Sequence, residues 1–238
     1  MISIIICTYN YGHYLDRCIQ SVLDQSIHNE PFEIILIDDG SEDETGKILQ
    51  RYGKKIKILT HSKNFGLGTS CNTGILNSTG EYFIRVDADD ELLPGSLQDL
   101  FTSLKRSPQS ALVYGDRVNC DSNGATKIFK HTDEINIYNI IAPGVMFRTS
   151  RVIEAGMYRN IYWEEHDLMI RLLSRWPAIY IQKSVYKYYL HGNNMTLSSI
   201  SRIDGWKYLI NLWGISELRK WGYEEEMESV YNQMMVEN

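Results

Sequence analysis

Residues 81–90 read E-Y-F-I-R-V-D-A-D-D, a short apolar run followed directly by three carboxylates. The run predicts a buried β-strand at residues 82–86, with Asp87, Asp89 and Asp90 at its carboxyl end. Three carboxylates in four residues repel one another unless a cation neutralises the charge. Hard oxygen ligands suit Mg²⁺ or Mn²⁺, and such ions usually share protein carboxylates with substrate phosphates. The stretch therefore predicts a metal site, and the alternative is an acidic turn that caps the next helix.

Short apolar runs recur on both sides of this stretch and alternate with segments of helical periodicity. The runs are nearly continuous, which is typical of parallel strands covered on both faces. We therefore expect an α/β fold with a mostly parallel central sheet flanked by helices. Ligands of such sheets bind at the carboxyl ends of the strands. Strands are predicted at residues 3–7, 32–37, 56–59, 82–86 and 111–114, and helices at 14–25, 41–52, 67–77 and 94–104.

From about residue 116 the pattern loosens, and all five tryptophans lie at or beyond position 163. An apolar stripe at helical spacing predicts an amphipathic helix at residues 202–220. A last helix is predicted at residues 224–236. The stripe consists of Ile203, Trp206, Ile210 and Trp213. Before the tail, strands are predicted at residues 145–147, 180–181 and 185–189, and a helix at 165–174.

The chain has no internal repeat, low-complexity tract or Pro/Gly-rich linker, so we expect one main domain with a helical extension. The main domain is expected over residues 1–200, with a nucleotide-binding half at 1–115 and an acceptor-side half at 116–200. The tail is expected over residues 201–238, where its apolar stripe would pack against the aromatic half. The alternatives for the stripe are a homodimer contact, a partner surface or shallow docking on a membrane.

The composition excludes several classes of protein. The 238 residues include 24 Lys and Arg against 30 Asp and Glu, which gives a net charge of −6. Disordered chains combine low hydrophobicity with high net charge, and nucleic-acid binders usually carry a basic surplus. No apolar run exceeds four residues, so no membrane span is expected. The N-terminus lacks the pattern of a signal peptide, and four unclustered cysteines indicate free thiols. We expect a cytoplasmic protein, with peripheral contact at the inner face of the membrane left open.

Polar side chains also follow the first two predicted strands. Thr8, Tyr9 and Asn10 follow the first, where a tyrosine could stack on a nucleobase or simply pack. Asp38 and Asp39 follow the second, in a turn that resembles a helix N-cap with a capping box. The N-cap interpretation does not explain two adjacent carboxylates. One of them could accept a hydrogen bond from an N–H of a nucleotide base.

Two more constellations lie in the second half of the chain. Glu164, Glu165 and Asp167 follow Trp163 at the start of a predicted helix. Acidic residues are favoured in a first helical turn by the macrodipole, and the functional alternative is a general base beside an aromatic platform. His191 begins an H-G-N-N segment. It is structural unless it reaches a metal or a diphosphate.

The order of these motifs resembles the family 2 glycosyltransferases of the GT-A fold over about residues 1–195. The matching segments are S-I-I-I-C-T-Y-N, I-L-I-D-D-G-S-E-D-E-T, N-F-G-L-G-T-S-C-N-T-G-I, G-E-Y-F-I-R-V-D-A-D-D and W-E-E-H-D-L-M-I-R-L. The resemblance implies a nucleotide-diphospho-sugar donor, with UDP-sugars favoured, a divalent metal and inversion at the anomeric carbon. It also implies work in bacterial surface polysaccharide or glycoconjugate synthesis, with a saccharide, a lipid-linked saccharide or a protein as acceptor and no nucleic-acid partner.

The resemblance assigns roles to single residues. Tyr9 matches the position that stacks on the base, and Asp39 the carboxylate that pairs with it. Asp89 matches a carboxylate on the ribose side, with Thr8, Asn10, Asp38 and Asp87 beside the same donor. Asp90 matches the metal ligand that reaches the diphosphate, and Asp89 and His191 are the further metal candidates. Glu165 matches the catalytic base, with Asp167 and Glu164 as the other candidates.

Two departures from the family pattern concern the donor site. The family usually has Pro where this chain has Cys7, and Ala-Arg-Asn where it has Ser70-Cys71-Asn72. The second departure removes a cation near the donor, for which Lys63 is the candidate substitute. Three other functions remain as alternatives. A glycoside hydrolase also uses two carboxylates but would need no nucleotide site and no D-D-G-S turn. A non-catalytic nucleotide-sugar binding module would keep the donor residues without a base, and a sugar-nucleotide pyrophosphorylase would have a Gly-rich loop with a basic residue after its first strand.

Overall fold

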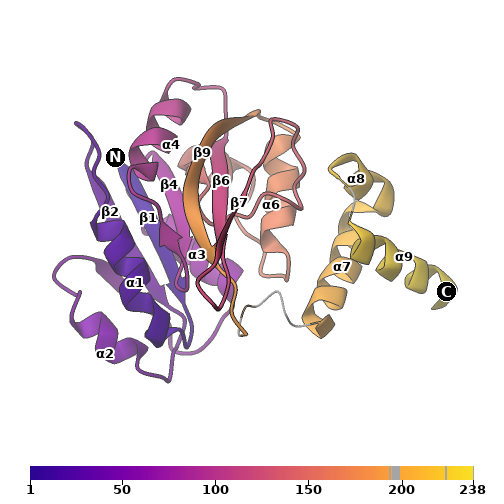
Figure 1. The fold of residues 1–238 in the computed structure, drawn as a ribbon. Coiled ribbons are helices and arrows are strands. Elements are labelled where there is room, and N and C mark those ends of the chain that lie inside the picture. Colours follow the sequence, from indigo (N-terminus) through magenta and orange to yellow (C-terminus); the bar gives the residue numbers. More distant parts are fainter. Residues whose placement is uncertain (193, 195–198, 223, 238) are drawn as a thin grey trace.

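A central sheet with helices on both faces forms the body of the protein (Figure 1). The computed structural model describes residues 1–192, 194, 199–222 and 224–237. Within these residues nine strands join in the order β3-β2-β1-β4-β8-β6-β9-β5, with β7 paired to β6. The strands are β1 (Ile2–Thr8), β2 (Phe32–Asp38), β3 (Lys57–Thr60), β4 (Tyr82–Asp87), β5 (Glu91–Leu92), β6 (Leu112–Cys120), β7 (Thr126–Phe129), β8 (Met146–Arg148) and β9 (Ala178–Tyr189).

The first four long strands are parallel, as the apolar runs predict. Strand β1 lies between β2 and β4, so their carboxyl ends meet at one edge of the sheet. Thr8 pairs with Asp38 and Cys7 pairs with Asp87 across the ladders. The register therefore brings the polar segments after three strands to one place. Beyond β4 the sheet is mixed, because β8 runs antiparallel to both β4 and β6.

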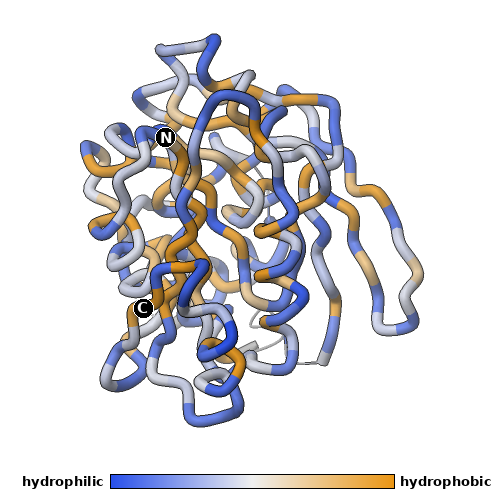
Figure 2. Tube along the Cα trace, turned by 90° about the vertical axis from the view of Figure 1, so that its left-hand side faces the viewer, coloured by the Kyte–Doolittle hydropathy of each residue, from blue (hydrophilic) through white to orange (hydrophobic). Residues whose placement is uncertain are grey.

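Alternation along the parallel strands divides the interior into two apolar layers. Ile4 and Ile6 of β1 face the layer of α1 and α4, whereas Ile5 faces the layer of α3 and α6. Figure 2 shows the resulting pattern, with apolar residues along the central strands and hydrophilic residues in the outer loops. The helices of the body are α1 (Gly12–Leu23), α2 (Thr45–Gln50), α3 (Leu67–Leu76), α4 (Ser96–Lys105), α5 (Thr149–Glu154) and α6 (Glu164–Leu173).

Three helices of the tail follow the body: α7 (Ser199–Trp213), α8 (Ile215–Lys220) and α9 (Glu225–Glu237). Their buried side chains, among them Trp206, Leu218 and Met227, belong to the same apolar cluster as those of α6. Gly205 lies so close to the body that an added Cβ would meet Trp163 Cδ1 at 2.7 Å. The apolar stripe of the tail therefore packs against the aromatic half. Over the described residues, no helix has the length and apolar composition needed to cross a bilayer.

The structure corrects the expected elements at three places. The helix expected at 41–52 with a capping box is the shorter α2, which has Glu44 at its N-cap position and no side-chain capping hydrogen bond. The expected helix at 202–220 is two helices, because Gly214 has a φ of +76° and ends α7. The two short strands expected at 180–181 and 185–189 are one strand, β9, whose irregular register opposite Gly115 and Asp116 breaks the apolar pattern.

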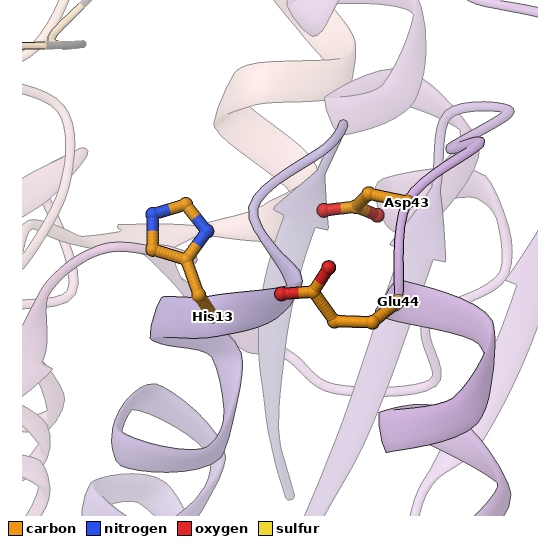
Figure 3. Close-up of side chains that lie close together, drawn as sticks. All are labelled: His13, Asp43 and Glu44. Atoms are coloured by element: carbon orange, nitrogen blue, oxygen red, sulfur yellow. The ribbon is translucent and has the colours of Figure 1, made fainter.

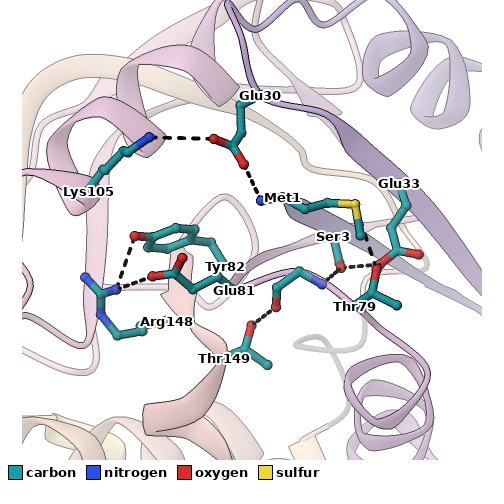
Figure 4. Close-up of polar contacts among 11 residues, drawn as sticks. Met1, Ser3, Glu30, Glu33, Thr79, Glu81, Tyr82, Lys105, Arg148 and Thr149 are labelled. Atoms are coloured by element: carbon teal, nitrogen blue, oxygen red, sulfur yellow. Dashed lines mark hydrogen bonds and ion pairs between the residues drawn. The ribbon is translucent and has the colours of Figure 1, made fainter.

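The amino end of the sheet, opposite the polar segments, is closed by side-chain hydrogen bonds (Figure 4). Arg148 is the centre of one such network. Its guanidinium donates to Glu81 at 3.0 Å, to Tyr82 Oη at 3.2 Å and to the Leu104 carbonyl at 3.2 Å. The Arg148 residue is only 8% exposed, so these partners satisfy a buried cation.

Candidate active site

A cavity of about 360 Å³ lies at the carboxyl ends of β1, β2 and β4. One wall comes from the parallel half of the sheet, and the other comes from the loop before α6 and the first turn of that helix. Among its lining residues are Thr8, Tyr9, Asp39, Arg85, Asp87, Asp89, Tyr162, Trp163, Glu164, Glu165, Tyr188 and Asn194. Seven of the thirteen residues expected at the site therefore share one cavity.

The segment after β1 contributes Thr8 and Tyr9 to the cavity. Thr8 is buried, whereas Tyr9 is 41% exposed and leaves an aromatic ring accessible. Asn10 does not line the cavity. Its backbone N–H donates to Ser41 Oγ at 2.9 Å, and its side-chain Oδ1 accepts from the Glu42 N–H at 2.8 Å. Asn10 therefore holds the first loop against the second loop.

The two carboxylates after β2 have different surroundings. Asp38 Oδ1 accepts from the Ser41 N–H at 3.0 Å, so Asp38 shapes the turn and does not line the cavity. Asp39 lines the cavity. Its Oδ1 accepts from the Phe65 N–H at 3.0 Å and contacts His61 Nδ1 at 2.6 Å, and its Oδ2 accepts from the Gly66 N–H at 2.9 Å. These contacts fix the carboxylate and leave acceptor capacity on Oδ2.

Lys63 lies in the loop between β3 and α3, outside the residues that line the cavity. Its ammonium lies 5.3 Å from the centroid of the Phe65 ring. The backbone of Lys63 packs against Gly40, where an added Cβ would come within 2.6 Å. The ammonium of Lys63 thus lies beside the Phe65 ring, and its expected role near the donor stays a prediction.

The acidic turn after β4 separates into carboxylates that line the cavity and one that does not. Asp87 and Asp89 line it. Asp89 Oδ2 lies 2.9 Å from His191 Nε2. Burial and the charge of Asp87 raise the pKa of the Asp89 carboxyl. A cation bound beside Asp89 would relieve the repulsion between the carboxylates of Asp87 and Asp89.

Asp90 points into the fold and does not fit the role of a ligand that reaches a diphosphate. Its Oδ2 accepts from Tyr186 Oη at 3.0 Å, and its Oδ1 accepts from the Tyr189 N–H at 2.8 Å. The Asp90 residue is 0% exposed, and burial raises the pKa of its carboxyl well above the usual range. Asp90 therefore ties the acidic turn to β9, and Asp89 is the carboxylate available to a metal.

The first turn of α6 brings two carboxylates to the other wall. Trp163 precedes them in a left-handed conformation with a φ of +64°, which starts the helix abruptly. The Glu165 side chain keeps 15% of its surface exposed, whereas Glu164 keeps 6%. Burial, together with repulsion from Glu164, raises the pKa of Glu165 to about 8. A carboxylate with this pKa is suited to accept a proton near neutral pH.

Asp167 lies one helical turn away from the cavity wall. It is 0% exposed and forms ion pairs with Arg159 and Arg171. Trp213 of the tail donates its indole N–H to Asp167 Oδ1 at 3.1 Å. These contacts give Asp167 a structural role at the junction of α6 and the tail, away from the lining residues.

Sequence reasoning missed Arg85, which also lines the cavity. Its side chain is 3% exposed within β4. The Nε and Nη2 groups donate to the two carboxylate oxygens of Asp87 at 2.8 and 3.1 Å, and Nη1 donates to Glu164 at 3.0 Å. A charged residue inside an apolar strand is the signal that could have revealed it, because a buried guanidinium needs carboxylate partners.

The two departures from the family pattern lie next to each other, and Cys7 and Ser70 are among the residues that line the cavity. Cys7 at the end of β1 and Cys71 in α3 have their sulfur atoms 3.8 Å apart. The neighbouring thiol and burial raise the pKa of Cys7, while the positive charge of Arg85 lowers it. The guanidinium of Arg85 thus lies near the position where the family usually has its arginine.

Whether the site suits a divalent metal can be tested on the donor atoms of Asp89, which lines the cavity, and of His191, which is not a lining residue but contacts Asp89. Asp89 offers carboxylate oxygen and His191 offers imidazole nitrogen within 2.9 Å of each other. Oxygen and imidazole ligands are compatible with Mn²⁺, and carboxylates with Mg²⁺. Asp87 lies on the same turn, and both of its carboxylate oxygens accept hydrogen bonds from Arg85. The residues present therefore fit such an ion.

A second group of potential ligands lies outside the cavity (Figure 3). His13, Asp43 and Glu44 have ligand atoms within 4.8 Å of one another. The Asp43 oxygens, however, accept from the backbone N–H groups of Gly12 and Thr45, each at 3.0 Å. Asp43 thereby joins the beginnings of α1 and α2, and the group is explained by helix packing.

Known proteins share both the sequence pattern and the fold. The model of "Glycosyl transferase family 2" matches residues 3–170. A chondroitin synthase of Escherichia coli is 28% identical over 94% of this chain and 36% of that protein. An uncharacterized glycosyltransferase of Rickettsia bellii is 35% identical over 78% of this chain and 29% of that protein. The chain thus spans about a third of the length of these two relatives.

Solved structures of low sequence identity share the fold. A crystal structure of S. aureus TarS 1-349 in complex with UDP-GlcNAc has a TM-score of 0.75 at 19% identity, covering 98% of this chain and 71% of that chain. The mannosyltransferase PcManGT from Pyrobaculum calidifontis, in complex with GDP-Man and Mn²⁺, has a TM-score of 0.67 at 14% identity over 88% of this chain and 64% of that chain. The expected fold class is confirmed by these matches. With a family model that covers most of its length, the chain belongs to glycosyl transferase family 2.

Proposed function

We propose that this chain transfers a sugar from a nucleotide-diphospho-sugar to an acceptor hydroxyl with inversion at the anomeric carbon. The observation that carries the proposal is that two walls with different chemistry face each other in one cavity. We call the wall at the strand ends the donor wall and the wall at the start of α6 the acceptor wall. Donor-side groups at the ends of three parallel strands face a carboxylate of raised pKa at the start of α6. A binding module would need only the first wall. We also propose that residues 1–200 divide into a nucleotide-binding half at 1–115 and an acceptor-side half at 116–200.

The donor wall favours a pyrimidine nucleotide. Tyr9 offers an exposed ring for stacking, and Asp39 lines the cavity beside it. Asp39 Oδ1 already has two partners and Oδ2 has one, so the carboxylate has room for about one more donor. Uracil or thymine presents a single ring N–H, whereas guanine presents an N–H and an amino group together. We therefore expect uridine or thymidine donors to bind better than guanosine donors.

The acceptor wall supplies the proton acceptor. In the proposed reaction Glu165 removes the proton of the acceptor hydroxyl as its oxygen attacks the anomeric carbon. The bond from that carbon to the nucleoside diphosphate breaks, and the diphosphate leaves with the bonding electrons. Direct displacement needs no enzyme nucleophile. Arg85, behind both walls, holds the carboxylates of Asp87 and Glu164 in place.

Asp89 and His191 would hold a divalent metal, Mn²⁺ or Mg²⁺, with Asp87 on the same turn. When bound, such an ion stabilises the negative charge of the departing diphosphate. The carboxylate of Asp89, in the acidic turn after β4, contacts the imidazole of His191. Tyr14 stacks on the imidazole of His191 with ring centroids 4.6 Å apart, and this contact fixes the ring plane.

The acceptor of the proposed reaction is a saccharide, free or carried by a lipid or a protein, in the synthesis of bacterial surface glycans. Tyr162 and Trp163 line the cavity beside Glu165, and aromatic faces suit sugar rings. The tail helices keep these two side chains in place, since Gly205 packs directly on both. For the tail, a homodimer contact and a peripheral contact with a membrane stay separate proposals.

Calorimetric titration of the whole chain with UDP, dTDP and GDP, each with and without Mn²⁺, tests the donor half of the proposal. We expect metal-dependent binding of UDP or dTDP and weaker binding of GDP. A Glu165→Gln variant then tests the base. It should bind the same nucleotide with nearly the parent affinity and lose sugar transfer. If the variant transferred sugar at the parent rate, the assignment of the base would be wrong.

A further inference from the structure

One buried cation touches carboxylates from both walls of the cavity. Arg85 lies in β4 between Ile84 and Val86, and only 3% of its side chain is exposed. A guanidinium in such surroundings is costly unless carboxylates and hydrogen bonds compensate its charge. Glu164, one of its partners, lies 79 positions further along the chain. A residue needed only within β4 would not require a partner on α6.

The contacts of Arg85 have a defined geometry. Two of its N–H groups form a fork on both oxygens of Asp87, at 2.8 and 3.1 Å. A third group donates to Glu164 at 3.0 Å, and Nη2 lies 3.8 Å from Glu165 Oε2. Bidentate arginine–carboxylate contacts restrict orientation as well as distance. Asp87 of the donor wall therefore sets the orientation of the Arg85 guanidinium. Glu164 and Glu165 of the acceptor wall contact the guanidinium in that orientation.

The acceptor wall needs such a constraint, because its carboxylates are crowded. Glu164 and Glu165 are neighbours in the chain, both largely buried, and Glu164 raises the pKa of Glu165. Arg85 lowers the pKa of Glu165, and its guanidinium lies 3.8 Å from Glu165 Oε2. Without this cation the two carboxylates would repel each other and the first turn of α6 would lose its link to β4.

We propose that Arg85 is a positioning residue, which fixes Glu165 relative to Asp87 and so sets the distance between base and donor. This inference rests on the proposed function, in which Glu165 is the base. Displacements of about 1 Å at a reacting group can cost on the order of 100-fold in rate. A purely structural role would leave the geometry of the base unchanged once the protein is folded.

The matched control is Arg148, a second arginine buried in the same sheet. It has a carboxylate partner, Glu81, at 3.0 Å, and it lies at the opposite end of the strands (Figure 4). Arg148→Gln therefore measures the cost of losing a buried guanidinium without touching the cavity. Arg85→Gln removes the charge of interest, and Arg85→Lys keeps a charge without the fork, which protects the test if the first variant folds poorly.

The first experiment needs no substrate. A double-mutant cycle combines Arg85→Gln with Glu165→Gln and measures unfolding in urea from pH 5 to 9. We expect the two changes to be non-additive, with the coupling growing as Glu165 loses its proton. The cycle of Arg148→Gln with Glu165→Gln should be additive at every pH. Additivity in the Arg85 cycle would overturn the proposal.

The second experiment follows release of UDP from UDP-glucose and UDP-N-acetylglucosamine with Mn²⁺ present. For Arg85→Gln we expect kcat to fall about 10- to 100-fold, with a smaller change in KM for the donor. The acidic limb of the pH profile, where Glu165 loses its proton, should move up by about one pH unit, because a nearby cation is lost. Arg85→Lys should keep the parent limb and recover part of kcat.

Three outcomes separate the two proposals. An unchanged pH limb in Arg85→Gln, or the same shift in Arg148→Gln, would overturn the positioning role alone. A loss confined to donor KM would mean that Arg85 serves only the donor wall, which also overturns it. Full activity of Glu165→Gln would instead remove the proposed base, whatever the result of the urea cycle.

Discussion

At the residue scale, the chemistry of the cavity depends on carboxylates that are neighbours in the sequence but have different surroundings in the fold. Asp38 and Asp39 are neighbours, yet one shapes a turn and the other lines the cavity. Asp89 and Asp90 separate in the same way. The sequence could identify these acidic turns but could not say which member points inward, because orientation depends on partners contributed by β9 and by the loop after β3.

The raised pKa of Glu165 predicts a pH dependence of stability. Its pKa rises from 4.5 to about 8 on folding, so the protonated form is favoured in the folded state. The stabilising contribution of the protonated Glu165 carboxyl to the free energy of unfolding is full below pH 4.5 and is lost as pH rises through about 8. Glu165→Gln should therefore gain stability relative to the parent over this range, by at most about 1.4 kcal/mol for each pH unit. Urea unfolding at pH 5, 7 and 9 measures the difference. The charged or titratable groups around Glu165 are Glu164, Asp87, Arg85, Arg117, Tyr158 and Tyr162.

Glu228 in the tail is a control, because its effect on stability should change with pH in the opposite direction to that of Glu165. Glu228 forms a bidentate contact with Arg219, which lowers the pKa of its carboxyl. A lowered pKa stabilises the fold above the unfolded value and loses this effect as pH falls. Glu228→Gln should thus lose a little stability at pH 7 and none at low pH. If both variants responded to pH alike, the cause would not lie in their individual carboxyls.

The donor wall gives a second prediction for single residues. Asp39→Asn places an amide N–H₂ where three donors now point, so we expect UDP to bind about 10- to 100-fold more weakly. Lys63→Ala should change UDP affinity less than about twofold, since surface contacts outside a site contribute little. Calorimetry with Mn²⁺ measures both. A large loss in Lys63→Ala would show that its ammonium reaches the donor after all.

At the element scale, the parallel strands and their helices were predictable because local and global preferences agree. The apolar run in β1 alternates between two buried faces, so it can only be a covered strand. The mixed strands after β4 were less predictable. Strands β5 and β8 have two and three residues, and their positions depend on pairing partners far along the chain. Strand β7 and helix α5 were not expected at all.

The packing of α7 on the loop before α6 gives a prediction for a helix position. A Cβ on Gly205 would lie 2.7 Å from Trp163 Cδ1 and 3.0 Å from Tyr162 Cβ. Gly205→Ala should therefore destabilise the fold by about 1–3 kcal/mol through overpacking and lower sugar transfer, since both aromatic residues line the cavity. Gly46→Ala in α2 is the control, because its Cβ meets no atom within 4 Å. It should be neutral or stabilising in urea unfolding. Equal losses in both variants would contradict the packing argument.

At the scale of the whole molecule, the cavity exists only because distant segments meet. The donor wall comes from residues before 90, and the base comes from α6. The ordered motifs in the sequence resembled one family, and that resemblance correctly gave the fold. It could not reveal Arg85 as the link between the walls, since the contact joins positions 79 residues apart. Side-chain partners of this kind follow from the assembled structure.

The apolar interior predicts that the body and the tail unfold together. One cluster contains Ile5 and Ile35 of the parallel half, Leu168 of α6, and Trp206 and Met227 of the tail. All five tryptophans lie at or beyond position 163, so their fluorescence reports only on the second half, whereas far-ultraviolet circular dichroism reports on every helix and strand. We expect the two urea transitions to coincide, because no layer of this cluster can be exposed without opening the others. An earlier fluorescence transition would instead mark the second half and its tail as a separate folding unit, and the junction of α6 with Gly205 as a contact between units.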